Sequence, residues 1–202
     1  MIAVLYANVR CRRLKHPNVV MLMGACLNPL NQVVIVTEYL SRGNLKDCLN
    51  DVKSLTTRLK IGADIAAGLG WLHAHNIVHR DLKLANLLVR VTHRRVMRAL
   101  DWHACWQVAD DWTVKISDFG LSLHLTKDLV CRGFKGNVKY SPPEILRARY
   151  DKTISIYPYS EKTDVYRYGV CYLQVFSCWP AITLVLVSCC GSWSAWSNYS
   201  LL

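Results

Sequence analysis

The stretch His79-Arg80-Asp81-Leu82-Lys83-Leu84-Ala85-Asn86 decides how the rest of this sequence is interpreted. It forms a dense polar cluster within 77–89, with apolar residues on both sides. Asp81 can accept or orient the proton of a hydroxyl group, and Lys83 supplies a point charge. Asn86 carries an amide oxygen, a ligand type that suits a hard cation such as magnesium. Taken alone, the cluster also fits a turn that exposes its charges to water, so its meaning depends on what accompanies it.

Three further motifs follow this stretch in chain order. They are Asp118-Phe119-Gly120, then Pro142-Pro143-Glu144, and then Asp164-Val165-Tyr166-x-Tyr168-Gly169 at the start of a predicted helix. Together with the H-R-D-x-K-x-x-N pattern of 79–86, they resemble the catalytic domain of eukaryotic protein kinases. Four motifs in the correct order make a chance match improbable. The resemblance implies an α+β fold of the bilobal protein-kinase type, with a partial N-lobe sheet and an incomplete helical C-lobe.

The resemblance also assigns roles to the polar residues. It implies transfer of the ATP γ-phosphate to a protein Ser or Thr, a reaction that depends on positioning and charge neutralisation. Asp81, Lys83 and Asn86 would be the catalytic residues. Asn86 and Asp118 would bind magnesium, so the implied cofactors are ATP and Mg²⁺. The position of Lys83 favours the Ser/Thr type of catalytic loop over the tyrosine-kinase type, and the implied partner is a protein substrate.

The adenine side of the site is also recognisable by resemblance. The segment Thr37-Glu38-Tyr39-Leu40 looks like the gatekeeper and hinge, where backbone groups would meet adenine, and Leu88 looks like the residue beneath the ring. The stretches at 16–20 and 23–26 resemble the tyrosine-kinase-like group. Plain core packing would explain the apolar positions equally well. The residues expected to bind the cofactor are Thr37, Glu38, Leu40, Leu88 and Asp118.

Hydrophobic spacing predicts the main elements. It indicates a short helix at 3–14, an antiparallel strand pair at 19–26 and 33–39 around a turn at 28–31, and a long buried helix at 55–75. The apolar stripe expected to face the core of that long helix consists of Leu59, Ala63, Ala66 and Leu69, with Ile65 and Leu72.

The N-terminal part departs from the kinase pattern. No G-x-G-x-x-G occurs in the 202 residues. No lysine precedes Lys15, so the strand lysine that binds the ATP phosphates in kinases has no counterpart. The helix glutamate that pairs with that lysine in kinases would fall on Ala7. We therefore interpret 1–40 as a partial N-lobe and hinge, and 41–170 as a partial C-lobe. The sequence predicts a kinase fragment, truncated at both ends, that is inactive by itself. A non-catalytic kinase-like scaffold and an incomplete gene product remain as alternatives.

An insertion separates the catalytic loop from the metal-binding motif. Asn86 and Asp118 lie 32 positions apart, whereas kinases keep them about a dozen apart, joined by a tight strand pair. Removal of 90–108 restores an uninterrupted kinase pattern. One hypothesis is a retained intron translated in frame. The other is a genuine basic loop for phosphate-rich partners, since the segment holds four arginines against one aspartate.

The C-terminal segment 171–202 carries no charge and is a hydrophobic tail foreign to kinases. A read-through or frameshifted end is the first interpretation, and membrane insertion is the alternative. The span 168–190 is long enough for a membrane helix, although its polar residues and proline weaken that interpretation. The net charge of +11 fits a basic surface without a specific nucleic-acid partner. Nine cysteines at irregular spacing predict free thiols in a reducing, cytoplasmic compartment. The sequence predicts no oligomeric state.

Overall fold

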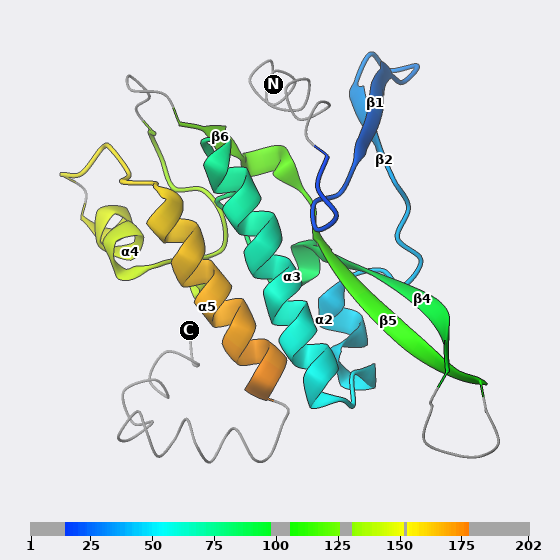
Figure 1. Cartoon of the computed structure of the whole chain (residues 1–202). Helices are drawn as coiled ribbons and strands as arrows, with labels where there is room; N and C mark the ends of the chain where they lie inside the picture. Colours follow the sequence, from blue (N-terminus) through cyan, green and yellow to red (C-terminus); the bar gives the residue numbers. More distant parts are fainter. Residues whose placement is uncertain (1–14, 98–105, 126–130, 152, 178–202) are drawn as a thin grey trace, which may run out of the picture.

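The computed structural model describes residues 15–97, 106–125, 131–151 and 153–177. A two-stranded hairpin stands above a helical body in which two long helices lie side by side, and a second hairpin projects from that body (Figure 1). This arrangement of small antiparallel sheets and helices is the predicted α+β class. The elements are β1 (Leu22–Leu27), β2 (Val33–Thr37), α2 (Leu45–Cys48), η1 (Leu49–Asp51), α3 (Leu55–Ala74), β3 (Ile77–Val78), η2 (Leu84–Asn86), β4 (Leu87–Met97), β5 (Trp106–Ile116), η3 (Phe119–Leu121), β6 (Leu123–His124), η4 (Val138–Tyr140), α4 (Pro143–Tyr150) and α5 (Glu161–Ser177).

The first hairpin confirms the predicted antiparallel pair and its turn. β1 pairs with β2 from Leu22 opposite Thr37 to Leu27 opposite Val33. In the turn, the Asn28 side-chain oxygen accepts the backbone N–H groups of residues 30 and 32, both at 2.9 Å. Asparagine is favoured in such turns because its short side chain replaces a backbone hydrogen-bond partner. The predicted helix at 3–14 lies outside the described residues.

The predicted strand at 19–26 begins three residues too early, because Val19 and Val20 serve a different sheet contact. Val19 forms a parallel bridge with Ile116, and the Val20 N–H donates to the Ile116 carbonyl at 2.9 Å. The Ile116 N–H in turn donates to the Asn18 carbonyl at 2.9 Å. Residues 18–20 therefore attach the upper hairpin to the end of β5, and β1 starts only at Leu22.

The helix α3 has almost the predicted bounds, but the predicted phase of its apolar stripe is wrong. Leu59, Ala63 and Ala66 are exposed, whereas Ile65, Leu69 and Leu72 are buried as predicted. Glycines occupy the close contacts instead of alanines. A Cβ atom on Gly68 would lie 2.5 Å from the backbone oxygen of Asn18, so the helix packs there at backbone distance. The complete buried face is Arg58, Ile61, Gly62, Ile65, Gly68, Leu69 and Leu72.

At both ends of the predicted insertion at 90–108, the described residues continue the hairpin that begins at Leu87. β4 and β5 are each 11 residues long and pair in an unbroken register from Leu87 opposite Ile116 to Met97 opposite Trp106. The base of this hairpin is anchored in the core, where Leu87, Val89, Val114 and Ile116 are fully buried. Residues 98–105 lie outside the described part of the chain.

Deletion of 90–108 should therefore leave the body folded. The strand pairs that join Leu87–Val89 to Val114–Ile116 stay in place. Among the side chains that the structure describes in 90–108, Val91 is the apolar one that packs against the core. We expect the deletion to lower the free energy of unfolding by no more than about 1–2 kcal/mol, the value of one partly buried aliphatic side chain. Urea denaturation measures this. The matched control is Val91→Ala, and a deletion that costs over about 2 kcal/mol more than this control contradicts the expectation.

The helix α5 corrects the predicted boundary at residue 170. The helix runs on to Ser177, and Cys171, Val175 and Phe176 are buried in the core. Arg58 of α3, itself buried, donates to the Val175 carbonyl and to the Val52 carbonyl. Burial raises the pKa of the Cys171 thiol to about 12. Residues 171–177 therefore belong to the core, and the rest of the predicted tail lies outside the described residues.

The membrane prediction concerns the same region. Within the described residues, which end at 177, no helix combines the length and the apolar character that crossing a bilayer requires. Most of the span at 168–190 lies beyond that limit.

Candidate active site

The structure brings the three predicted catalytic residues into contact. The Lys83 ammonium lies 2.6 Å from the Asp81 carboxylate. The Asn86 amide nitrogen donates to the Asp81 backbone carbonyl at 2.8 Å and to its carboxylate at 3.1 Å. The short helix η2 brings Asn86 back toward Asp81 before β4 begins. Asp81 is therefore held in one orientation by a cation and an amide at once.

Asp164 anchors this loop from below, and sequence reasoning missed that role. Its side chain is fully buried and accepts the backbone N–H groups of His79 at 2.6 Å and Arg80 at 2.9 Å. Arg80 has a φ of 66°, a conformation that costs a non-glycine residue energy unless its surroundings enforce it. His73 of α3 lies 3.2 Å from the same carboxylate. The motif at 164–169 was the available signal for Asp164. It indicates the start of a helix but does not indicate the contact with the backbone of His79 and Arg80.

Asp118 is tied to the catalytic loop through its neighbours. The backbone N–H and the hydroxyl of Ser117 both donate to the Asn86 carbonyl, at 2.9 and 2.8 Å. The Ser117 carbonyl lies 2.8 Å from His79 Nε2, and the Phe119 ring meets the His79 ring edge-on at 5.4 Å. Asp118 itself is exposed, with a φ of 60°. Its carboxylate accepts the Gly120 N–H at 3.3 Å and is open to a ligand, on a segment that Ser117 joins to Asn86.

A cleft of about 250 Å³ lies between the upper hairpin and the segment 117–120. Three of the five residues predicted to bind the cofactor, namely Thr37, Leu88 and Asp118, line it. Among the described residues of the lining, Asp118 is the only charged one, and none is a lysine or arginine. The remaining lining residues are Val19, Val20, Leu22, Ile35, Leu72, Ser117, Phe119 and Gly120.

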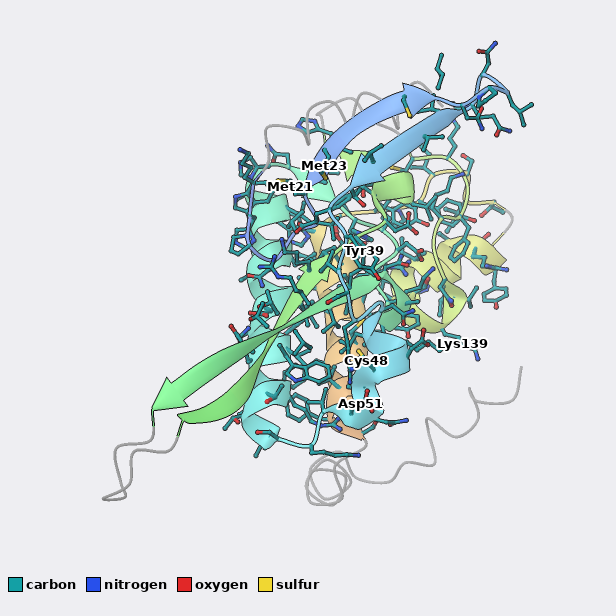
Figure 2. All side chains as sticks on the ribbon, turned by 90° about the vertical axis from the view of Figure 1, so that its right-hand side faces the viewer. Met21, Met23, Tyr39, Cys48, Asp51 and Lys139 are labelled. Carbon is teal, nitrogen blue, oxygen red and sulfur yellow. The ribbon has the colours of Figure 1, made fainter. Side chains whose placement is uncertain are left out.

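Glu38 and Leu40 do not line this cleft. The Glu38 carboxylate accepts the Met21 N–H at 2.8 Å and the Lys115 ammonium at 2.6 Å. Burial opposes its ionisation, but these hydrogen bonds outweigh burial and hold the pKa of Glu38 below its ordinary value. Leu40 is buried, and Tyr39, labelled in Figure 2 on the chain that leads away from β2, is exposed. Sequence reasoning gave no hint of Lys115, which lies between two core residues.

The segment 131–141 completes the site on the side of α4 and α5. The Tyr159 hydroxyl accepts the Lys135 N–H at 2.6 Å and donates to the Lys135 carbonyl at 2.9 Å. Arg167 is fully buried and donates to the Ser141 hydroxyl at 3.2 Å. Burial lowers the pKa of Arg167 and raises that of Tyr159. The Arg80 guanidinium lies over the Tyr159 ring at 5.4 Å, so the segment is joined to the catalytic loop.

Comparison with known proteins decides what this arrangement is. The family model described as protein tyrosine and serine/threonine kinase matches residues 5–182. The chain belongs to the protein kinase family. The predicted family and fold are therefore confirmed, and the match extends beyond residue 170, in agreement with the course of α5.

Several curated kinases are similar to this kinase chain. It is 38% identical to the serine/threonine-protein kinase CTR1 of Arabidopsis thaliana over 79% of this chain and 17% of that protein. It is 33% identical to the serine/threonine/tyrosine-protein kinase HT1 of the same plant, over 78% of this chain and 34% of that protein. Mitogen-activated protein kinase kinase kinase 13-B of Xenopus laevis is 35% identical over 79% of this chain and 14% of its own. These relatives confirm the tyrosine-kinase-like, Ser/Thr resemblance, and the chain spans about a third or less of their length.

The fold agrees with a solved kinase structure. The chain superposes on the yeast RNA polymerase II CTD kinase CTDK-1 complex with a TM-score of 0.65 and 21% sequence identity. The superposition covers 88% of this chain and 50% of that chain. The structure therefore represents part of a kinase domain.

Proposed function

We propose that this kinase chain provides the residues that act on the substrate hydroxyl when phosphate is transferred from ATP to a Ser or Thr of a protein. The cluster of Asp81, Lys83 and Asn86 supports this proposal best. Asp81 would accept or orient the substrate hydroxyl, since its carboxylate is held by two donors. Lys83, at 2.6 Å from that carboxylate, would place its charge beside the transferred phosphate. Its position in the loop supports Ser/Thr specificity.

The oxygen donors at this site fit magnesium. Because the Asn86 amide nitrogen donates to Asp81, the amide oxygen is the end available to a cation. Asp118 adds an exposed carboxylate on a segment bonded to Asn86. Two protein oxygens are a normal share for magnesium, which takes its other ligands from water and phosphate. The bound ion would neutralise the phosphate charge.

We further propose that these 202 residues hold ATP only weakly. The cleft is smaller than the roughly 300–1,000 Å³ of typical ligand sites, and among the described residues of its lining only Asp118 is charged. None of these described residues would attract the α- and β-phosphates. This observation favours the second candidate function for the isolated chain, a kinase-like scaffold without turnover.

ATP with magnesium should therefore stabilise this chain very little. At a few millimolar ATP, a dissociation constant above that concentration raises the midpoint of thermal unfolding by less than about 1 °C. Thermal shift measurements with and without Mg²⁺ test this, with Asp118→Asn as the matched control. A shift of several degrees that Asp118→Asn abolishes would show that the chain binds ATP well by itself.

A chimera tests the proposed transfer. Residues 41–177 would follow the N-lobe of the relative CTR1, which is 38% identical to this chain. We expect the chimera to incorporate radioactive γ-phosphate into Ser and Thr of a general protein acceptor, and Asp81→Ala in the chimera to stop it. A folded chimera that binds ATP but transfers no phosphate contradicts the proposal and favours the scaffold. The protein substrate and the cytoplasmic location remain predictions.

A further inference from the structure

The segment 131–141 has a defined position, which makes its exposed side chains usable for recognition. At one end, the Tyr157 N–H donates to the Cys131 carbonyl at 2.9 Å, and Arg132 forms an antiparallel bridge with Ile156. In the middle, Tyr159 holds both backbone groups of Lys135. Residues 156–159 therefore fix the backbone of this segment.

The segment is also close to the catalytic cluster. A Cβ atom on Gly136 would lie 2.3 Å from the Arg80 carbonyl oxygen, so the two backbones are in contact. Tyr140 is near Lys83. Burial is the main cause that raises the pKa of Tyr140, and the charge of Lys83 acts against it. A peptide that offers its hydroxyl to Asp81 would therefore pass over this segment.

The side chains exposed on this surface are mostly basic. Between residues 131 and 149, Glu144 is the single acid. Arg149 lies over the Phe134 ring at 4.5 Å, which places the end of α4 against the segment. Lys139 lies at the margin of the molecule in Figure 2, with its side chain pointing away from the ribbon. We define the basic platform as the exposed residues Arg132, Lys135, Lys139, Arg147 and Arg149.

We infer that the basic platform selects protein substrates with acidic residues beside the phosphorylated hydroxyl. This inference rests on the proposed function. A single exposed ion pair changes affinity only a few-fold, but several together add up to a preference of about tenfold. The same charges reject basic peptides, because like charges brought together cost energy.

The aromatic residues of this surface favour a protein over a nucleic acid. Single-stranded nucleic acids bind by stacking their bases on free aromatic faces. Here Phe134 packs against Arg149, and Tyr157 stacks on Tyr159 at 6.0 Å between ring centroids. These rings contact protein groups, whereas Tyr150 at the end of α4 is exposed, so charge is the main recognition element of the platform.

Peptide binding to the full 202-residue chain tests the inference without ATP. The probe is a fluorescent nonapeptide with a central serine flanked by glutamates, compared by anisotropy with matched glutamine and lysine versions. At about 50 mM salt we expect the glutamate peptide to bind at least tenfold more tightly than the glutamine peptide, with an affinity that falls as salt rises. Equal affinities for the two peptides would overturn the inference.

Two double variants separate the platform from the general positive charge. Lys135→Gln with Lys139→Gln should weaken binding of the glutamate peptide at least fivefold. Lys15→Gln with Lys53→Gln removes the same charge from exposed positions of other segments and should change it less than twofold. Equal losses would assign the binding to net charge and overturn the inference.

A labelled oligouridylate is the remaining probe. If it binds more tightly than the glutamate peptide and loses that affinity in the platform variant, the platform serves a nucleic acid and the inference is wrong. Weaker binding of the oligouridylate supports the inference. Because these measurements need no turnover, selective peptide binding together with an inactive chimera would refute only the proposed catalysis.

Discussion

Replacement of Asp164 by alanine should lower the free energy of unfolding by about 3–5 kcal/mol. The carboxylate is fully buried and accepts two backbone N–H groups, from His79 and Arg80, besides its contact with His73. Alanine leaves these buried donors without an acceptor, and each unsatisfied group costs about 1–3 kcal/mol. The left-handed backbone of Arg80 also loses the contact that enforces it. Urea denaturation of the variant measures the loss.

Two control variants separate these contributions. Asp164→Asn keeps one side-chain oxygen as an acceptor, so we expect it to lose about half as much stability as the alanine variant. His73→Ala removes only the contact at 3.2 Å and should cost about 1 kcal/mol. A cost below about 1 kcal/mol for Asp164→Ala would mean that water replaces the carboxylate, and the role of Asp164 as an anchor would be wrong.

The mutual contacts of the three predicted catalytic residues could be expected from sequence because the kinase resemblance specifies both residue type and spacing. Asp81, Lys83 and Asn86 lie within six consecutive positions, so a short helix and a turn are enough to bring them together. The antiparallel pair of β1 and β2 was predictable for the same reason, since its signal is local. The contacts of Asp164 with His79 and of Arg167 with Ser141 could not be predicted, because each joins segments more than 20 positions apart.

Glycine explains where helix periodicity failed. A pattern based on side-chain hydrophobicity prefers Ala63 and Ala66 to Gly62 and Gly68, yet the glycines face the core. The core selects them because Asn18 and Tyr172 approach the α3 backbone more closely than a Cβ atom allows. The close approach is a property of the partner segment, so no local pattern in α3 records it.

The continuation of the 90–108 segment as a hairpin has a similar cause. Its sequence looks foreign to a kinase, but backbone pairing requires little of side chains once Leu87–Val89 and Val114–Ile116 have set the register. The buried base therefore determines the structure of the strands that leave it.

Replacement of Gly136 by alanine should cost about 2–4 kcal/mol of stability. Gly136 has a φ of 91°, which an L residue adopts at a cost of about 1–2 kcal/mol. A Cβ atom would also lie 2.3 Å from the Arg80 carbonyl oxygen and 2.8 Å from the Arg167 guanidinium. The backbone would have to shift to make room, and such overpacking costs about 1–3 kcal/mol. The expected loss is measured by urea denaturation at a fixed pH.

The matched control is Gly70→Ala. Gly70 is exposed within α3, and a Cβ atom there would meet nothing within 4 Å. Alanine should therefore stabilise the chain by about 0.5–1 kcal/mol, since it is the better helix former. Equal effects of the two substitutions would contradict the close contact at Gly136. Because that contact joins the basic platform to the catalytic loop, Gly136→Ala should also weaken binding of the glutamate peptide, whereas Gly70→Ala should leave it unchanged.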